Sequence, residues 1–216
     1  MPLRTLRRLA GLALLLISLG VLAWGSWPRP VETRRLALQP GELGAGAPSA
    51  YELELRWQPR LRAGERAGLA LRLLPQDNPP PGAPPQPAAT AGAAVVALEA
   101  RLELPGIAYT PRGRVTQFLL PGRMAEFDYT LLPDAPGAYP ATLWLHRLPS
   151  AGSAESTAPR VITAQQLQFD VQRLAGLDGR WARALGATGA LLALPVGLDG
   201  AAAWLWRRLA ARYRPS

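Results

Sequence analysis

Cysteine and lysine are absent from the 216 residues, and histidine occurs only once, at His146. Without cysteine the chain has no disulfide, no thiolate metal site and no cysteine nucleophile. A single histidine rules out a multi-histidine metal centre. The sequence also lacks a glycine-rich phosphate loop, a nucleophile elbow and a metal-ligand spacing. We therefore expect a protein that is not an enzyme and that binds no cofactor and no metal.

The net charge of +9 comes entirely from arginine and is concentrated at the two ends of the chain. Between residues 29 and 180, 16 arginines are nearly balanced by 14 acidic residues. The excess lies in two groups beside apolar segments: Arg4, Arg7, Arg8, Arg207, Arg208, Arg212 and Arg214. A nucleic-acid-binding domain would carry its basic patch on the folded part, so we expect no nucleic acid partner. Arginines beside apolar segments instead mark the cytoplasmic side of a membrane.

The first apolar segment, residues 9–27, contains 19 residues and no charge. A stretch of about 20 apolar residues crosses a bilayer. Trp24 and Trp27 stand at its far end, where indole rings favour the membrane interface. We expect an uncleaved transmembrane helix after a cytoplasmic N-terminus (residues 1–8). The alternative is a signal peptide with a poor cleavage motif at 23–25. Both interpretations send the following residues out of the cytoplasm.

A second apolar segment, residues 184–206, has 23 residues and one charge, and it follows a short linker at 173–183. Trp181 marks one end, and Trp204 and Trp206 mark the other, before a basic tail at 207–216. This length crosses a bilayer with some tilt. We therefore expect a two-pass protein of the cell membrane, of bacterial envelope type, with both termini in the cytoplasm.

Pro195 and Asp199 interrupt this second segment, and three interpretations of them stay open. Asp199 could be a partly hydrated carboxylate near the cytoplasmic face. Alternatively, Pro195 could break the helix, with Asp199 capping an interfacial helix at 201–212. Asp199 could also be an intramembrane proton or ion relay. The sequence does not say what this carboxylate faces.

Small residues recur at four-residue spacing along the second segment, in the sets Ala182, Gly186, Ala190 and Ala193, Gly197, Ala201. Faces of small residues let membrane helices approach closely. The partner of this face is expected to be the first span or a second protein, and a homo-oligomer through the same face is an alternative.

Between the two apolar segments the sequence predicts a linker at 28–49 and then an all-β domain at 50–172. Apolar and polar residues alternate in the manner of half-buried strands. Turn signals such as Pro105-Gly106 and Pro121-Gly122 separate seven such stretches, at 51–57, 68–74, 96–104, 114–120, 125–132, 138–148 and 161–172. About seven short strands favour a β-sandwich. A proline-rich loop at 76–94 is typical of an extended spacer.

Residues 131–145, "LLPDAPGAYPATLWL", resemble the tyrosine corner of immunoglobulin-like domains, with Tyr139 at the corner and Ala141 in the place of the usual cysteine. The opening stretch "ELELRWQPRLRAGERAGLALRLL" is similar to the first strands of bacterial immunoglobulin-like extracellular domains. The resemblance covers residues 50–172 and implies an immunoglobulin-like sandwich. It carries little information about function.

Two groups of side chains are candidates for catalysis. His146 falls in phase with Trp144 and opposite to the apolar set of its strand, so we expect it to face outward. The acid pairs Glu52/Glu54 and Glu126/Asp128 each share one strand face, as a glycosidase needs but as a solvated strand face also shows.

The sequence as a whole therefore indicates an all-β immunoglobulin-like sandwich flanked by two transmembrane helices. We expect a non-catalytic binding or structural protein, an accessory subunit or adaptor in a membrane or envelope complex. Its expected partners are the lipid bilayer and other membrane protein subunits. The alternatives are an oligomeric ion or proton conductor that uses Asp199, and an envelope hydrolase.

Overall fold

A computed structural model describes residues 3–38, 42–43, 51–76, 95–149 and 158–193. The chain divides into two compact units. One is Arg29–Gln172, and the other combines Met1–Pro28 with Arg173–Ser216. Each unit is described by itself.

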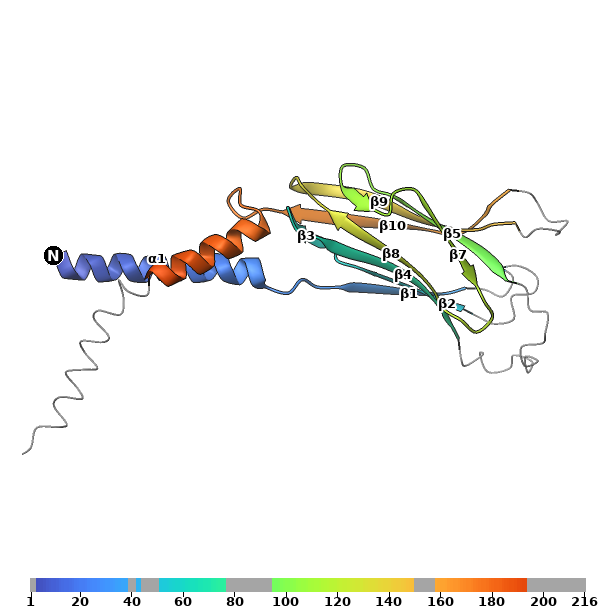
Figure 1. The fold of residues 1–216 in the computed structure, drawn as a ribbon, viewed down its shortest axis with the longest axis horizontal. Coiled ribbons are helices and arrows are strands. Elements are labelled where there is room, and N and C mark those ends of the chain that lie inside the picture. The colour runs from blue at the N-terminus through green and yellow to red at the C-terminus, as the bar shows by residue number, and fades with distance from the viewer. Residues whose placement is uncertain (1–2, 39–41, 44–50, 77–94, 150–157, 194–216) are drawn as a thin grey trace, which may run out of the picture. The chain divides into compact units, whose positions relative to one another are not determined.

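The unit Arg29–Gln172 is a sandwich of two five-stranded sheets (Figure 1). The first sheet has the order β1-β2-β4-β8-β6, with β1 (Glu32–Ala37), β2 (Tyr51–Trp57), β4 (Ala67–Pro75), β8 (Ala125–Leu132) and β6 (Ala108–Thr110). The second has the order β3-β10-β9-β5-β7, with β3 (Arg60–Arg62), β10 (Arg160–Gln172), β9 (Gly137–Arg147), β5 (Val96–Glu103) and β7 (Arg114–Leu119).

The strand order is that of an immunoglobulin-like fold. Strands β2, β4 and β8 lie opposite β10, β9 and β5, which matches the A-B-E and G-F-C order of such sandwiches. Strand β3 leaves the first sheet and pairs with β10 in parallel, whereas the other strand pairs are antiparallel. The expected all-β immunoglobulin-like sandwich is confirmed.

Alternation of apolar and polar residues places the core between the two sheets. The inward positions of β2 and β4 pair directly with each other, for example Leu55 with Leu71, so their side chains share one face. The most deeply buried side chains come from both sheets and include Tyr51, Tyr129, Phe127, Phe169, Leu53, Leu73, Leu98 and Leu102. Burial of these apolar side chains stabilises the sandwich.

The chain enters the sandwich at Arg29, where a buried ion pair holds it. The Arg29 guanidinium pairs with the Glu65 carboxylate in the turn before β4, and their side chains are 12% and 10% exposed. Arg62, at the end of β3, places its Nη1 3.9 Å from the same carboxylate. A buried carboxylate is stable only when a positive charge or hydrogen-bond donors compensate for its lost hydration, and the two arginines do so for Glu65.

All seven predicted strands are present, but the linker predicted at 28–49 is wrong in part. Residues 32–37 of that linker form β1, an edge strand that pairs with β2 over its whole length. The alternation signal is missing because β1 buries little: Leu36 is partly buried, and the other five residues of the strand are exposed. Strands β3 and β6 were also not foreseen, since three residues are too short to show a period of two.

The other unit contains α1 (Leu3–Ser26) and a second helical segment at 179–193. This segment begins at residue 179, so the linker predicted at 173–183 ends too late and the second helix begins earlier than the predicted residue 184. Asp178 stands at the N-terminal boundary, where an acidic or small polar side chain favours helix initiation, and its carbonyl accepts the Ala182 N–H at 2.9 Å.

Helix α1 contains one candidate membrane span, Leu9–Ser26, of which 17% is buried. It is the single such span among the described residues. Residues 194–216 lie outside the described residues, so the second span predicted at 184–206 is described only up to 193. Several predicted features also lie outside: Pro195, Asp199, Gly197, Ala201, Trp204, Trp206, Arg207, Arg208, Arg212 and Arg214.

The two helices of this unit contact each other through small residues and run antiparallel. A Cβ added to Gly186 would lie 2.7 Å from the backbone nitrogen of Leu22. A Cβ on Gly189 would lie 3.1 Å from the Cβ of Ser18, and the Arg183 guanidinium donates to the Gly25 carbonyl at 3.3 Å. Glycine at these positions permits the close approach of the two backbones.

Candidate functional site

The corner before β9 is held by Tyr139. Its hydroxyl donates a hydrogen bond to the carbonyl of Ala135 at 3.1 Å, four residues upstream. Ala141 follows two residues later and is 4% exposed. Gly106, with φ of +85°, packs against the Tyr139 ring so closely that a Cβ would lie 2.7 Å from it. This is the geometry of a tyrosine corner, at the place that the sequence indicates.

The predicted acid pairs lie on the outer face of the first sheet, where an arginine from a neighbouring strand pairs with one acid of each pair. The register aligns Arg35, Glu54, Arg72 and Glu126 in one row across four strands. Arg35 Nη2 lies 2.9 Å from Glu54 Oε2, and Arg72 Nε donates to Glu126 Oε1 at 2.5 Å.

This hydrogen bond and the charge of Glu126 raise the pKa of the Arg72 guanidinium. Glu52 lies on the same face of β2 as Glu54, and Asp128 on the same face of β8 as Glu126. The row is therefore a set of cross-strand ion pairs, whose net effect on sheet stability is modest.

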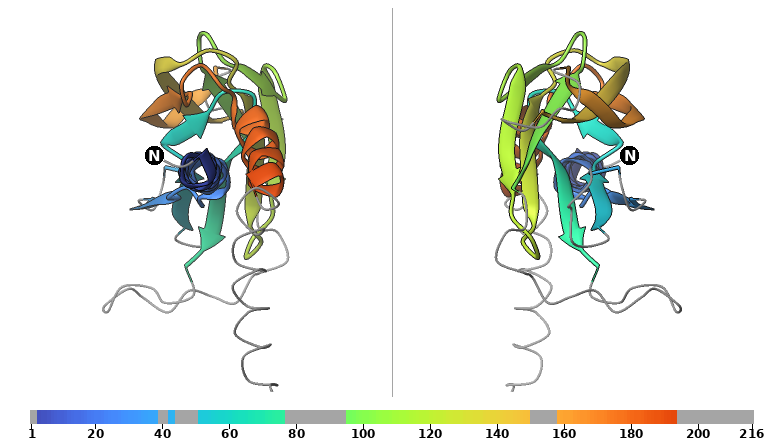
Figure 2. Two further views of the ribbon diagram at one scale, coloured as in Figure 1. Left: turned by 90° about the vertical axis from the view of Figure 1, so that its left-hand side faces the viewer. Right: turned by 90° about the vertical axis from the view of Figure 1, so that its right-hand side faces the viewer.

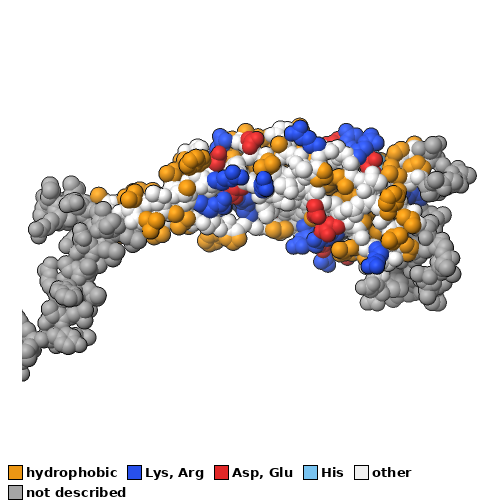
Figure 3. All heavy atoms as spheres, viewed as in Figure 1, with side chains coloured by type: hydrophobic (Ala, Val, Ile, Leu, Met, Phe, Trp, Pro, Cys, Tyr) orange, Lys and Arg blue, Asp and Glu red, His pale blue; other side chains and the backbone are white. Residues whose placement is uncertain are grey.

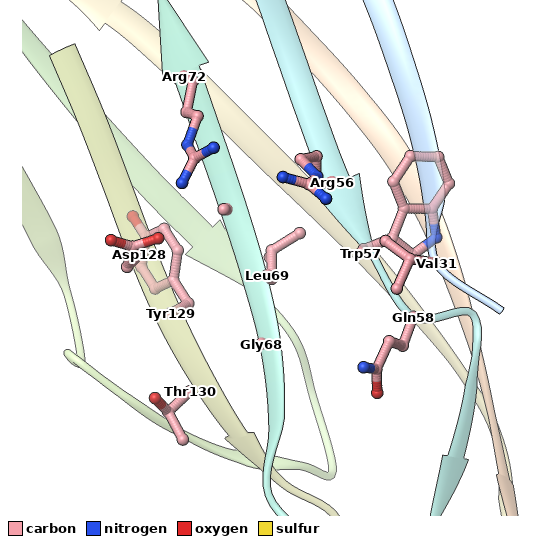
Figure 4. A pocket seen from close by; sticks show the side chains of 11 residues that line it. Val31, Arg56, Trp57, Gln58, Gly68, Leu69, Arg72, Asp128, Tyr129 and Thr130 are labelled. Carbon is pink, nitrogen blue, oxygen red and sulfur yellow. The ribbon is translucent and has the colours of Figure 1, made fainter. Parts of the chain in front are cut away.

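A hollow of about 370 Å³ opens beside this row (Figure 4). It exists because Gly68 and Ala70 leave the outer face of the central strand β4 without long side chains. Figure 4 shows the polar side chains around it, and the register places Arg56 and Asp128 on the same face as Ala70. The hollow is open, and both polar and apolar residues line it.

The outer face of the second sheet carries an aromatic and charged cluster around Trp144. The Trp144 indole donates to Glu103 Oε2 at 3.1 Å, and Arg101 Nη2 lies 2.9 Å from Glu103 Oε1. His146 faces outward, as its phase in the strand predicts, and stacks on Trp144 with ring centroids 6.1 Å apart. No nucleophile or acid is hydrogen-bonded to His146 among the described residues, and its Nδ1 is buried without a partner there.

A second, larger opening of about 660 Å³ lies where β1 extends past the edge of the facing sheet. The residues that line it come from β1, from the end of β2 and the residues that follow it, and from β9 and β10. They are Glu32, Arg34, Trp57, Pro59, Pro140, Ala141, Thr142, Gln166, Leu167 and Gln168. The Arg34 guanidinium lies 5.5 Å from the centre of the Trp57 ring and donates to Gln165 Oε1 at 3.2 Å. We call this opening the β1–β10 groove.

Hydrophobic side chains gather at the right-hand end of the sandwich in Figure 3. In the loop that connects β7 to β8, Leu120 is 48% and Met124 58% exposed, and Phe118 on β7 is 69% exposed. Tyr51 fixes this loop, because its hydroxyl donates to the Leu120 carbonyl and accepts the Gly122 N–H. The exposed apolar side chains are typical of a contact surface.

The predicted membrane-topology residues fall in the helical unit. Arg4, Arg7 and Arg8 lie within α1. Trp27, just after α1, is 71% exposed and Trp181 is 63% exposed, while Trp24 is partly buried. Exposed indoles at helix ends suit a membrane interface.

Sequence reasoning missed the β1–β10 groove, because both β1 and its position opposite β10 depend on pairing between distant segments. It also missed the exposed Phe118. The available signal was local: "RVTQFLL" places Phe118 in phase with the polar residues of its strand.

No family model and no curated protein matches the chain. Among solved structures, it is similar to a chain of the human zinc-α2-glycoprotein–prolactin-inducible protein complex (6% identity, TM-score 0.37, covering 68% of this chain and 99% of that one). It is also similar to the CARDB domain of a Pyrococcus furiosus protein solved with two metal ions (9% identity, TM-score 0.33, 66% and 88% covered). A third is the ASH/PapD-like domain of human CEP192 (11% identity, TM-score 0.30, 69% and 91% covered).

Proposed function

We propose that this chain is a non-catalytic, membrane-anchored binding protein. In this role it is an accessory subunit or adaptor, and it presents its sandwich outside the cytoplasm to other membrane or envelope proteins.

The surface of α1 carries this proposal. Leu16 is 61% and Ile17 65% exposed, and the uncharged stretch Leu9–Ser26 is mostly unburied within the chain. Leaving this much apolar surface in water costs about 25 cal/mol per Å². A bilayer removes that cost, since lipid tails are as apolar as leucine. The glycine contacts with residues 179–193 leave Leu16 and Ile17 on the outside of the helix pair.

The sandwich supports binding rather than catalysis. The acids that sequence reasoning considered for hydrolysis include Glu54 and Glu126, which are engaged by arginines. His146 stacks on the Trp144 indole, and no hydrogen bond joins it to a nucleophile or an acid among the described residues. The hollow of Figure 4, the Trp144 cluster and the exposed end near Phe118 are all surfaces on which another protein could dock.

Purification from native membranes tests the proposal. The tagged full-length chain would be solubilised in mild detergent, and its mass and companions measured by light scattering and mass spectrometry. We expect a complex with at least one other membrane or envelope protein in fixed ratio. A homogeneous monomer without a stoichiometric companion would contradict the binding role.

The anchor is tested separately by alkaline carbonate extraction of the membranes. An integral protein stays in the pellet, and a peripheral one is released. Release of the chain would contradict the anchoring role of Leu9–Ser26, whatever the companion proteins are.

A further inference from the structure

On the side of the sandwich where β1 is the edge strand of the first sheet, the edge of the second sheet beside β10 is only partly filled. Sheet one continues past β2 into β1, but sheet two is continued past β10 only by the three residues of β3. Strand β3 pairs with Asp170, Val171 and Gln172, so residues 160–169 of β10 have no strand on that side among the described residues. Strand β1 therefore extends over an unoccupied position, which is the β1–β10 groove.

The exposure of β1 supports this geometry. Strand β1 buries little on its inward face: Arg34 is exposed although it pairs with the buried Leu55 of β2. Its guanidinium lies over the Trp57 ring and reaches Gln165 of β10 by a side-chain hydrogen bond, so no strand backbone fills the space between β1 and that part of β10 among the described residues. In Figure 2, β1 (blue) lies at one side of the sandwich, away from the yellow-green strands of the opposite edge.

Along the free edge of β10, backbone groups point away from the neighbouring strand β9, in the plane of the sheet. The Asp170 N–H bonds to the Pro59 carbonyl on the β3 side at 2.7 Å. Because the direction of N–H and C=O groups repeats every two residues along a strand, the backbone groups of Gln168 and Gln166 point to the same edge. Both residues are exposed.

This edge also lacks the features that protect exposed edges. Natural edge strands carry charges, proline or inward-pointing ionic groups that block pairing. Strand β1 has Glu32, Arg34 and Arg35, whereas residues 161–169 of β10, "VITAQQLQF", contain no charge and no proline. The single irregularity is a bulge between Val161 and Thr163, at the far end of the strand.

We propose that the β1–β10 groove receives an extended segment of a partner protein, which pairs with the free edge of β10 as an added strand. The inference rests on the proposed function and names its binding site. The added strand continues the position that β3 occupies, and it places alternate side chains on the floor beneath β1, on Trp57 and Leu167. Its other side chains lie beside Gln166 and Gln168.

The chemistry of the groove defines the guest. Trp57, Ala141 and Leu167 are 4–5% exposed and form an apolar floor. The outward neighbours Thr142, Gln166 and Gln168 are polar and uncharged, and β1 adds the charged side chains of Glu32 and Arg34. The fitting guest is therefore a segment in which apolar residues alternate with polar ones.

The absence of cysteine permits a direct test in native membranes. A single cysteine at Gln168→Cys, in the full chain, would carry a benzophenone maleimide, and crosslinked products would be mapped by mass spectrometry. Thr116→Cys is the matched control, because it is exposed on the outer face of the same sheet at the opposite edge. We expect crosslinks from position 168 to one contiguous segment of a different protein, and none to that segment from position 116.

Three substitutions at one position separate pairing from folding. Gln166→Pro removes an edge-facing N–H, and Gln166→Lys keeps it but adds a charge; each should reduce the crosslink about tenfold. Gln166→Thr keeps both the N–H and the neutral edge and should retain it. Thermal melting of the lysine variant shows whether the sandwich is intact.

Four outcomes would overturn the inference: equal crosslinking from position 116, crosslinks to a second copy, crosslinks to another segment of the same chain, or full crosslinking by a folded Gln166→Lys chain. In each case a complex purified from membranes would still support the proposed function. Loss of every companion protein, in contrast, would contradict the proposed function itself.

Discussion

At the residue scale, Tyr139 joins the turn at residues 133–137 to the strand that follows it. The loss of a single hydrogen bond to a backbone carbonyl costs about 0.5–1.5 kcal/mol. We expect Tyr139→Phe to lower the free energy of unfolding by about 1 kcal/mol, since it removes only the bond to Ala135. Urea denaturation of the full chain in detergent, followed by tryptophan fluorescence, measures the change.

Thr116→Val is the matched control for this substitution, because Thr116 is exposed and its hydroxyl has no recorded partner among the described residues. It should change the unfolding free energy by less than about 0.5 kcal/mol. An equal loss in both variants would show that the Tyr139 hydroxyl does not hold the corner.

The hydroxyl of Tyr129, unlike that of Tyr139, is buried and has no hydrogen-bond partner among the described residues. Burial raises the pKa of Tyr129 from 10.0 to about 12. The unfolded chain therefore loses this proton at a lower pH than the folded chain does. The contribution of the protonated Tyr129 to the free energy of unfolding is complete below pH 10 and is lost as the pH rises from about 10 to about 12.

We expect Tyr129→Phe to leave the unfolding free energy at pH 7 unchanged or raised by about 1 kcal/mol, because it removes an unsatisfied polar group. It should also flatten the decline of stability above pH 10. Thermal melting of both proteins between pH 7 and pH 11 measures this. A variant that is markedly less stable at pH 7, with an unchanged alkaline decline, would contradict the assignment.

At the scale of elements, the contact between α1 and residues 179–193 depends on glycine. A Cβ at Gly186 would lie 2.7–2.9 Å from Leu22 atoms, most of them backbone, so a larger side chain must push the helices apart. A cysteine pair at Ser18 and Gly189 should form a disulfide under mild oxidation, because the two Cβ positions are only 3.1 Å apart. We expect Gly186→Leu to reduce the yield of that disulfide severalfold.

Ile17 provides the control for this crosslink, since it is adjacent to Ser18 but 65% exposed. A cysteine pair at Ile17 and Gly189 should crosslink weakly, with or without the Gly186 substitution. Equal yields from the two pairs would mean that the helices do not meet on this face.

The elements also show how far the sequence predicts the structure. "YELELRW" predicts β2 because its apolar side chains alternate into the core, and the same pattern predicts every long strand of both sheets. Strand β1, "ETRRLA", is not predictable in this way, since it is held by pairing with β2 and buries almost nothing.

The candidate site was predicted less well for the same reason. The sequence shows that Glu126 and Asp128 share a face, but the arginine that engages Glu126 lies 54 residues earlier. The groove depends on two edges from opposite ends of the domain. The order of the strands in the two sheets decides both the Arg72–Glu126 pair and the groove. The alternation of apolar and polar residues in the sequence does not encode that order.

At the scale of the whole molecule, the proposed role needs both units: an apolar helix, Leu9–Ser26, as the membrane anchor, and a sandwich with candidate contact surfaces among its described residues. In this proposal the helix sets where the sandwich is presented, and the sandwich sets what is bound. The side of the membrane on which the sandwich lies is therefore the central claim.

Cysteine accessibility tests that claim most directly, since the chain has no cysteine of its own. Single variants Thr116→Cys, Thr5→Cys and Ser216→Cys would be exposed to a membrane-impermeant maleimide in spheroplasts, before and after permeabilisation. We predict labelling of Thr116→Cys in intact spheroplasts, and labelling of the two terminal cysteines only after permeabilisation. Labelling of Thr116→Cys only after permeabilisation would place the sandwich in the cytoplasm and contradict the account.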